Sequence, residues 1–176
     1  MPQLQQLNIR FDPVQDRLLL KLRAHDAGEM RLWLTRRFVK LLWRVLHPML
    51  SELSGAAAQP HQAAQDAVMA FQHQQAVAKT DFTSAYRSDV KPTPLGSEPI
   101  LAATIQRQSL NDRQAQIKLA PLTGPGIELT CDADTLHAIC ASLMAAVKKT
   151  DWDLDLKLFS AATPTPVANA DGVIRH

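Results

Sequence analysis

The feature that most constrains the fold is a change of hydrophobic period along residues 30–53. Apolar side chains stand at every second position from Met30 to Leu34, which is the period of a strand with one buried face. Thr35 then suits the N-cap of a helix, and from Arg36 to Leu53 the apolar spacing becomes helical. The stretch therefore predicts a strand that leads directly into a helix.

Apolar residues cover most of the circumference of this predicted helix. A narrow polar strip interrupts them, at Arg37, Lys40, Arg44 and His47. One sheet covers one face of a helix, so a second layer must cover the rest. We expect that layer to be the second half of the chain, the Ala- and Gln-rich segment, or another copy of the chain. Burial of a large aliphatic side chain is worth roughly 1.5–3 kcal/mol, so packing alone accounts for this helix.

The two halves of the chain show the same order of predicted elements. In the first half, strands are expected at 7–11, 17–24 and 30–34, before the helix. In the second half, strands are expected at 100–110, 114–120 and 127–131, and Asp132 takes the N-cap place before a helix at 133–149. We interpret the pattern as two βββα units, each an antiparallel meander followed by a helix, and as a candidate pseudo-symmetric duplication. Two unrelated meanders would show the same pattern, so that alternative stays open.

Two further segments complete the predicted architecture. Residues 61–79 predict a linker helix rich in Ala and Gln, with a thin apolar stripe at Ala64, Val68, Phe71 and Ala78. A proline-containing loop follows. Near the end, apolar side chains alternate with charged ones from Asp151 to Leu158, which predicts a final edge strand.

The predicted fold class is therefore α+β. We expect the first βββα unit at 1–54, the Ala/Gln-rich helical linker at 55–99, the second unit with the terminal strand at 100–160, and a disordered tail at 161–176. A chain of 176 residues is long enough to bury a sizeable core.

Composition and charge limit which cellular compartment and which kind of partner we expect. No apolar run is long enough for a membrane span and no secretory signal is visible, so we expect a cytoplasmic protein without membrane association. The two cysteines, Cys131 and Cys140, are expected to be reduced. Residues 1–50 contain nine Lys/Arg and four Asp/Glu, whereas residues 51–176 contain ten and thirteen. This separation suits an anionic partner of the first unit, or an internal contact between the halves.

No familiar catalytic motif stands out in the sequence. It has no phosphate-binding glycine loop, no HExxH and no GxSxG. Cys131, His137 and Cys140 are spaced so that three ligands could meet a zinc ion. The two cysteines, however, align with the apolar Leu34 and Trp43 of the first unit, so we interpret them as core thiols. We therefore expect no enzymatic activity, no metal and no cofactor.

Two groups of residues are candidate binding sites. The basic group consists of Arg31, Trp33, Arg37, Lys40 and Arg44. Its strip of cations suits the phosphates of a nucleic acid or a partner surface, although a solvated face is the commoner meaning of such a strip. The acidic group consists of Asp151, Asp153 and Asp155. It suits a cation or a basic partner, or it keeps an edge strand from pairing.

A curved antiparallel sheet followed by one helix resembles, in topology alone, the Whirly and PUR-type proteins that bind single-stranded nucleic acid. Those proteins have four strands before the helix, whereas three are predicted here, and only Trp33 and Arg31 match their aromatic and basic sheet residues. We expect a non-enzymatic binding or adaptor protein that engages a protein partner or a second copy of itself. The alternative is a nucleic-acid-binding module that uses the basic group.

Overall fold

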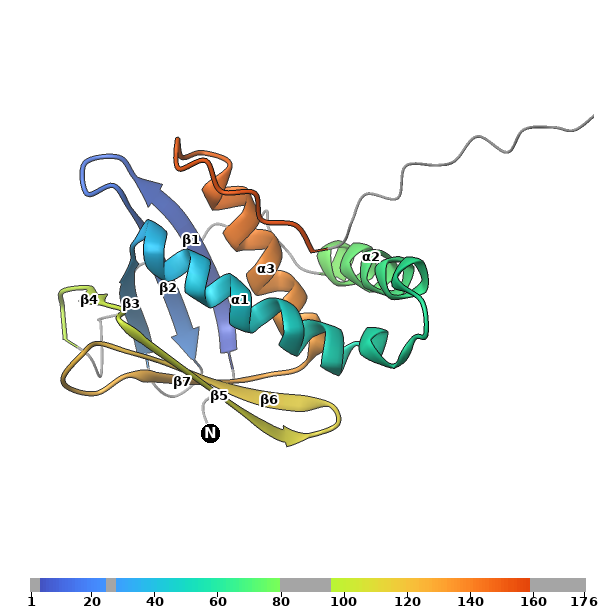
Figure 1. The fold of residues 1–176 in the computed structure, drawn as a ribbon. Coiled ribbons are helices and arrows are strands. Elements are labelled where there is room, and N and C mark those ends of the chain that lie inside the picture. Colours follow the sequence, from blue (N-terminus) through green and yellow to red (C-terminus); the bar gives the residue numbers. More distant parts are fainter. Residues whose placement is uncertain (1–3, 25–27, 80–95, 159–176) are drawn as a thin grey trace, which may run out of the picture.

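A computed structural model describes residues 4–24, 28–79 and 96–158, and within them the fold is α+β (Figure 1). The helices are α1 (Arg36–Leu53), the short 3-10 helix η1 (Ala56–Ala58), α2 (Gln62–Lys79) and α3 (Ala133–Val147). Sheet A contains, in spatial order, β1 (Leu4–Asp12), β2 (Arg17–Ala24), β3 (Gly28–Leu34) and β4 (Ile100–Leu101). Sheet B contains β5 (Thr104–Asn111), β6 (Gln114–Ala120) and β7 (Ile127–Cys131).

The first three strands form the predicted antiparallel meander. At the turn between β1 and β2, the side chain of Asp12 accepts hydrogen bonds from the backbone N–H groups of Val14 and Gln15, both at 3.0 Å. The pairing register aligns the apolar residues of β1, β2 and β3 on one face of sheet A. This alternation is confirmed in β3, where Met30, Leu32 and Leu34 are buried.

Helix α1 begins and ends where its sequence predicts. The hydroxyl of Thr35 accepts a hydrogen bond from the backbone N–H of Phe38 at 3.2 Å, which satisfies a group that the first turn leaves without a partner. The apolar side of the helix is buried, through Phe38, Val39, Leu42, Leu46, Met49 and Leu50. Helix α3 packs beside α1 and against β1, so two helices cover the same face of sheet A (Figure 1).

The chain between α2 and sheet B corrects one prediction. Residues 100–110 were expected to form one strand, but the segment is divided into β4 and β5. Strand β4 pairs in parallel with β3, and the N–H of Ala102 then donates to the carbonyl of Trp33 at 3.0 Å. The next residue, Ala103, donates to the carbonyl of Ala120 in β6 at 2.9 Å. The strand is interrupted because the chain changes its hydrogen-bond partner from sheet A to sheet B.

The predicted final edge strand is wrong. Residues 151–158 form no strand, and Asp153 has a left-handed φ of 51°, which interrupts an extended conformation. The alternation still has a physical basis, because Trp152 and Leu158 are buried against the body while the aspartates face solvent. The carbonyl of Leu158 lies 2.9 Å from the ring Nε2 of His47 on α1. The segment therefore packs against α1 and β1 instead of extending a sheet.

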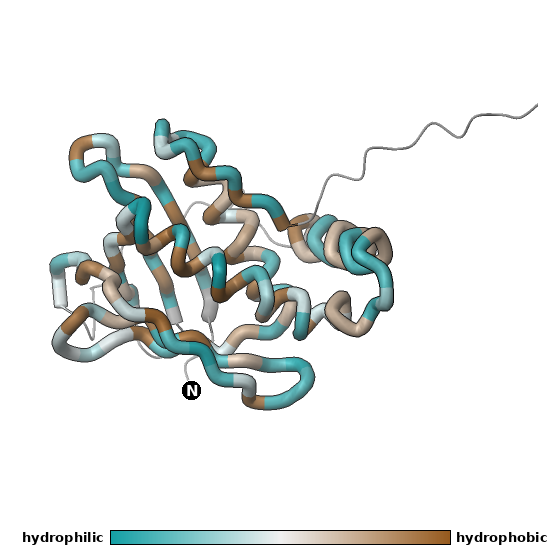
Figure 2. Tube along the Cα trace, viewed as in Figure 1, coloured by the Kyte–Doolittle hydropathy of each residue, from teal (hydrophilic) through white to brown (hydrophobic). Residues whose placement is uncertain are grey.

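Helix α2 forms as predicted, but its apolar stripe was predicted only in part: Val68 packs against the core, whereas two other members of the stripe do not. Phe71 is 61% exposed and Ala78 is exposed, whereas Met69 and Ala76 are buried. Figure 2 shows hydrophilic and apolar residues mixed along this helix. The prediction failed because the inner face of α2 makes several of its contacts through glutamine and histidine side chains, which a search for apolar spacing ignores.

One hydrophobic core joins the two predicted units. Its buried side chains come from both sheets and from all three α-helices of the described residues. The proposed boundaries at 54 and 99 stay predictions. The predicted tail at 161–176 lies outside the described residues.

Candidate functional site

The outer face of α1 carries three of the five predicted basic-site residues. Arg37, Lys40 and Arg44 are exposed, and no hydrogen bond or ion pair joins them to the part of the chain that the structure describes. They surround Leu41, which is 40% exposed although it lies on a helix with a large apolar face. Leu41 is therefore an exposed apolar side chain with three cations beside it, and those cations have no ion pair among the described residues.

Three acidic residues of the first unit are already engaged inside the chain. Glu29 pairs with Arg31 at 2.5 Å. Asp16 accepts a hydrogen bond from the indole N–H of Trp152 at 2.6 Å, and Glu52 pairs with Arg107 at 3.3 Å. These contacts leave the cations of α1 without an internal counter-charge among the described residues. An external partner with negative groups would therefore meet little competition.

The structure does not bring all five predicted residues together. Arg31 and Trp33 belong to the face of β3 opposite to Leu32 and Leu34, whereas α1 lies on the side of Leu34. The sheet therefore separates them from the outer face of α1. Sequence spacing missed this separation, because Arg31 and Arg37 are close in the chain but lie on two sides of sheet A.

The back face of sheet A forms a second basic surface. The register places Arg10, Leu19 and Trp33 in one row across β1, β2 and β3, with Leu101 of β4 beside Trp33. The next row contains Asn8, Lys21 and Arg31. Leu19 is 5% exposed and the side chain of Arg31 is 26% exposed, so this surface is less open than the outer face of α1.

The predicted acidic group lies near the first unit, but it is not bonded to the basic strip. Asp151, Asp153 and Asp155 are exposed, and Asp155 forms an ion pair with Lys157 at 2.5 Å. Lys148 and Lys149 are also exposed just before this segment. The surface beside α1 is therefore one of mixed charge.

The cysteine and histidine group does not form a metal site. Cys131, Cys140 and His137 are all fully buried, and the described residues hold no cluster of three potential ligands. Burial, followed by the charge of Asp132, raises the pKa of Cys131 to about 12. Burial, followed by Cys131, raises the pKa of Cys140 to about 12. The two residues are core thiols that stay protonated at neutral pH.

A contact between two histidines was not predicted from the sequence. The Nδ1 atoms of His73 on α2 and His137 on α3 lie 3.3 Å apart, and the ring centroids are separated by 5.3 Å. Burial, followed by His73, lowers the pKa of His137 to about 4, although Asp134 acts in the opposite direction. The helical spacing gave a weak sign that His73 faces the interior, because this residue lies one turn after the buried Met69 and one turn before the buried Ala76.

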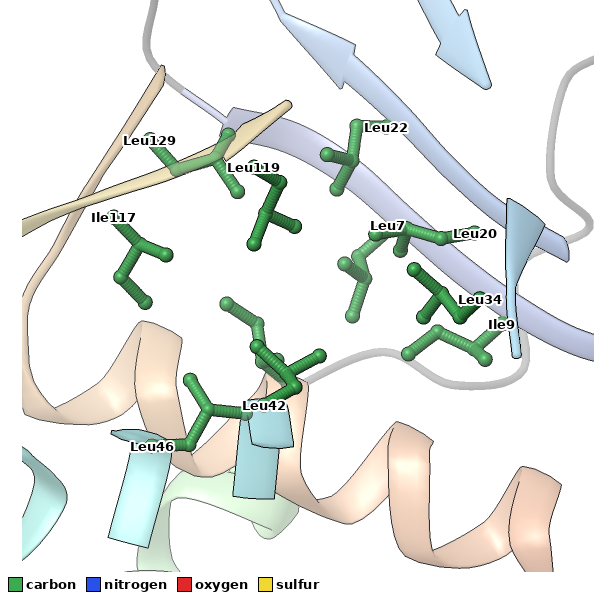
Figure 3. Close-up of a pocket in the computed structure, with 11 residues that line it drawn as sticks. Leu7, Ile9, Leu20, Leu22, Leu34, Leu42, Leu46, Ile117, Leu119 and Leu129 are labelled. Carbon is green, nitrogen blue, oxygen red and sulfur yellow. The ribbon is translucent and has the colours of Figure 1, made fainter. Parts of the chain in front are cut away.

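The interior between the sheets contains a cavity of about 20 Å³, lined by eleven aliphatic side chains (Figure 3). Leu20 and Leu34 come from sheet A, Ile117 and Leu119 from sheet B, and Leu46 from α1. The volume has room for about one water molecule, and the walls offer no polar group to bind it. It is a packing defect of the core and not a binding pocket.

Comparison with known proteins adds no family. A search of protein-family models, of curated proteins and of solved structures finds no match to the chain. In the residues that the structure describes, no helix combines the length and apolar character needed to cross a bilayer. The residues themselves are therefore the basis for a functional proposal.

Proposed function

We propose that this chain is a non-enzymatic binding protein that engages another protein through the outer face of α1. The observation that carries the proposal is the group of cations at Arg37, Lys40 and Arg44 around the exposed Leu41, and these cations have no ion pair with the residues that the structure describes. Arginine and exposed apolar side chains are enriched in the centres of protein interfaces, and complementary charge speeds association.

The packing of α1 supports the choice of its outer face. Its apolar side meets sheet A, α3 and η1 of the same chain, and its last turns lie near β6. The second layer that the sequence predicted around α1 is therefore formed by the same chain. The helix is held rigid before any partner arrives, so little conformational entropy is lost on binding.

The chemistry around α1 favours a protein over a polyanion. An apolar group of a partner would cover the exposed part of Leu41, and a row of phosphates does not supply one. The carboxylates of Asp151, Asp153 and Asp155 would repel phosphates that approached from their side. A protein surface with acidic groups around an apolar side chain satisfies both features, and a second copy of the chain belongs to this class.

The absence of an active site is also part of the proposal. The groups with clearly shifted pKa values, His73, His137, Cys131 and Cys140, belong to the interior and the α2–α3 contact, and the cavity in the core is small and apolar. A catalytic site needs convergent polar groups at an accessible position. Among the described residues, the groups with shifted pKa values do not line this cavity.

A photo-crosslinking residue at position 41 tests the proposal. We expect a discrete protein adduct in cells that contain the partner, and we expect the double variant Arg37→Glu, Arg44→Glu to lose at least about 90% of it. The matched control carries the same crosslinker at Leu122, which is 83% exposed on another part of the surface. A product at twice the mass of the chain would identify a second copy.

Two outcomes would overturn this assignment. One is equal labelling from positions 41 and 122, which would show that contact at α1 is not specific. The other is a nuclease-sensitive adduct at position 41. As a control, the free energy of unfolding of the Arg37→Glu, Arg44→Glu chain must lie within about 0.5 kcal/mol of that of the original chain. Both arginines are surface residues without an ion pair among the described residues, so their replacement should change stability little.

A nucleic-acid-binding module is the second candidate, and the back face of sheet A favours it. Arg10 lies in the same row as Trp33, two strands away, and Arg31 lies in the next row; an aromatic ring on a face with cations suits a stacked base and its phosphate. In this candidate, the variant Arg37→Glu, Arg44→Glu would keep its affinity for nucleic acid, whereas Arg10→Glu would weaken it. The partial burial of Trp33 makes this surface the weaker of the two.

We also propose that the two βββα units arose by duplication. In each unit, the residue after the third strand caps the helix: Thr35 accepts from the N–H of Phe38, and Asp132 accepts from that of Thr135 at 2.8 Å. Leu34 and Cys131, which precede these caps, are both fully buried. These equivalent roles support a common origin.

A further inference from the structure

The contact between His73 and His137 has room for one proton between its two Nδ1 atoms. One ring must donate through Nδ1–H and the other must accept, because the atoms are 3.3 Å apart. The Nε2 of His137 is buried and has no hydrogen-bond partner. Buried donors without partners are rarer than buried acceptors without partners. We therefore assign the Nδ1–H tautomer to His137, which donates to His73.

A second proton in this contact would break it. With a proton on Nδ1 of both rings the contact has no acceptor, and the charge of protonated His73 lies in a poorly solvated place. His137 has no exposed surface, and His73 is half-buried. Relief requires the two rings to move apart, and the rings belong to different helices.

Helix α2 buries few side chains fully. Met69 and Ala76 are the side chains that it buries fully among the described residues. Near η1, Gln72 donates to the carbonyl of Ser54 at 3.0 Å, and Gln65 donates to the carbonyl of Gln59 at 2.9 Å. Gln65 lies in the first turn of α2, whereas Gln72 directly precedes His73, so the bond from Gln72 holds the middle of the helix beside the histidine contact. By contrast, α1 buries six side chains in the main core.

We propose that the His73–His137 contact is an acid-sensitive attachment, and that its protonation releases α2 from α3 while both sheets, α1 and α3 stay folded. This inference is independent of the partner proposed for α1. It concerns the α2–α3 interface, and it assigns a role to the polar inner face of α2.

The direction of the pH dependence follows from the low pKa of both rings. Burial lowers the pKa of His73, and burial and His73 lower that of His137 to about 4. A released His137 would regain a pKa near 6.5, so the released form binds the proton more tightly. The attachment is therefore fully present above about pH 6.5 and is lost as the pH falls toward 4.

Other charged groups around the pair do not reverse this direction. Asp134, on the same helix, favours protonated His137 but does not restore its ordinary pKa. Cys131 and Cys140 stay neutral in acid because their pKa values are raised. On α2, Asp66 accepts a hydrogen bond from Gln62 at 2.9 Å. Among the described residues of α1 and β1, which also pack on α3, no charged group shifts the pKa of His137.

Hydrogen exchange of the full chain, followed by mass spectrometry at about pH 7 and about pH 4.5, tests the release. Labelling times are scaled for the intrinsic exchange rate, so that only structural protection is compared. We expect protection of residues 62–79 to fall by roughly ten- to a hundredfold at the lower pH, and that of residues 36–53 to stay unchanged. The variant His73→Gln keeps a neutral polar side chain and should remove the pH dependence.

Two controls separate release from general acid unfolding. His61→Gln changes an exposed histidine just before α2 and should behave as the original chain does. His137→Leu should also remove the pH dependence, and it serves as a second test if His73→Gln alters α2 at neutral pH. Equal protection of α2 at both pH values would overturn the proposal. So would a joint loss of protection in α1 and α2, or an unchanged acid response in both His variants.

Discussion

Replacing Arg31 by Met is expected to lower the free energy of unfolding by about 3 kcal/mol. The carboxylate of Glu29 is fully buried and bonds Arg31 at 2.5 Å through one oxygen, while its other oxygen has no hydrogen-bond partner. Removal of the guanidinium leaves a buried negative charge without compensation, which typically costs about 3–5 kcal/mol. We take the lower end because the Arg31 side chain is 26% exposed. Urea denaturation measures the change.

A matched variant tests whether the loss of stability comes from leaving Glu29 unpaired or from removing any arginine on this face of sheet A. Arg10→Met removes an exposed arginine from the same face of sheet A and should change stability by less than about 0.5 kcal/mol. The double variant Glu29→Met, Arg31→Met should recover most of the loss, because no unpaired charge remains. Equal small effects of Arg31→Met and Arg10→Met would show that Glu29 does not depend on Arg31.

Leu46→Ala is expected to lower the free energy of unfolding by about 2–5 kcal/mol. Leu46 is fully buried and lines the cavity where α1 meets both sheets and α3. Truncation would enlarge that cavity at the centre of the shared core, so the loss should lie in the upper half of the range. Thermal or chemical denaturation with two probes, one in each unit, measures it.

Leu41→Ala is the control for this experiment, because it makes the same substitution on the same helix. Leu41 is 40% exposed, so its truncation should change stability by less than about 0.5 kcal/mol. Similar losses for both variants, or unfolding of one unit while the other stays folded in Leu46→Ala, would contradict a core that depends on both units.

The sequence predicted those elements whose local signals agree with their packing. Alternating residues and turn residues indicated β2, β6 and β7 with the bounds that the structure shows. Thr35, the change of period and the apolar spacing predicted α1 from Arg36 to Leu53. In these segments, the side chains that favour the local conformation are also the ones that the core buries.

The remaining features depend on neighbours that are distant in the chain. The alternation in residues 151–158 shows that one side is buried, but it cannot distinguish a sheet edge from an unpaired segment that packs on α1 and β1. The division between β4 and β5 follows from the change of partner between Trp33 and Ala120, 87 residues apart in the chain. The histidine contact joins residues 64 positions apart, and its polar character gave no apolar period to follow.

The candidate site was predicted in part. The exposure of Arg37, Lys40 and Arg44 agrees with their place on the polar strip of the helix. Their grouping with Arg31 and Trp33 was incorrect in space, because the strand and the helix direct these residues to opposite sides of sheet A. The role of all five stays a prediction.

We propose above all that the cations of α1, which form no ion pair within the described parts of the chain, serve a protein and not a polyanion. The most direct measurement is the titration of fluorescently labelled single- and double-stranded oligonucleotides with the purified chain, at low and at physiological salt. We expect at most weak binding at low salt, none at physiological salt, and no difference in the physiological-salt result for Arg37→Glu, Arg44→Glu. Tight, salt-sensitive binding that this double variant abolishes would contradict the claim and make α1 a nucleic-acid-binding element.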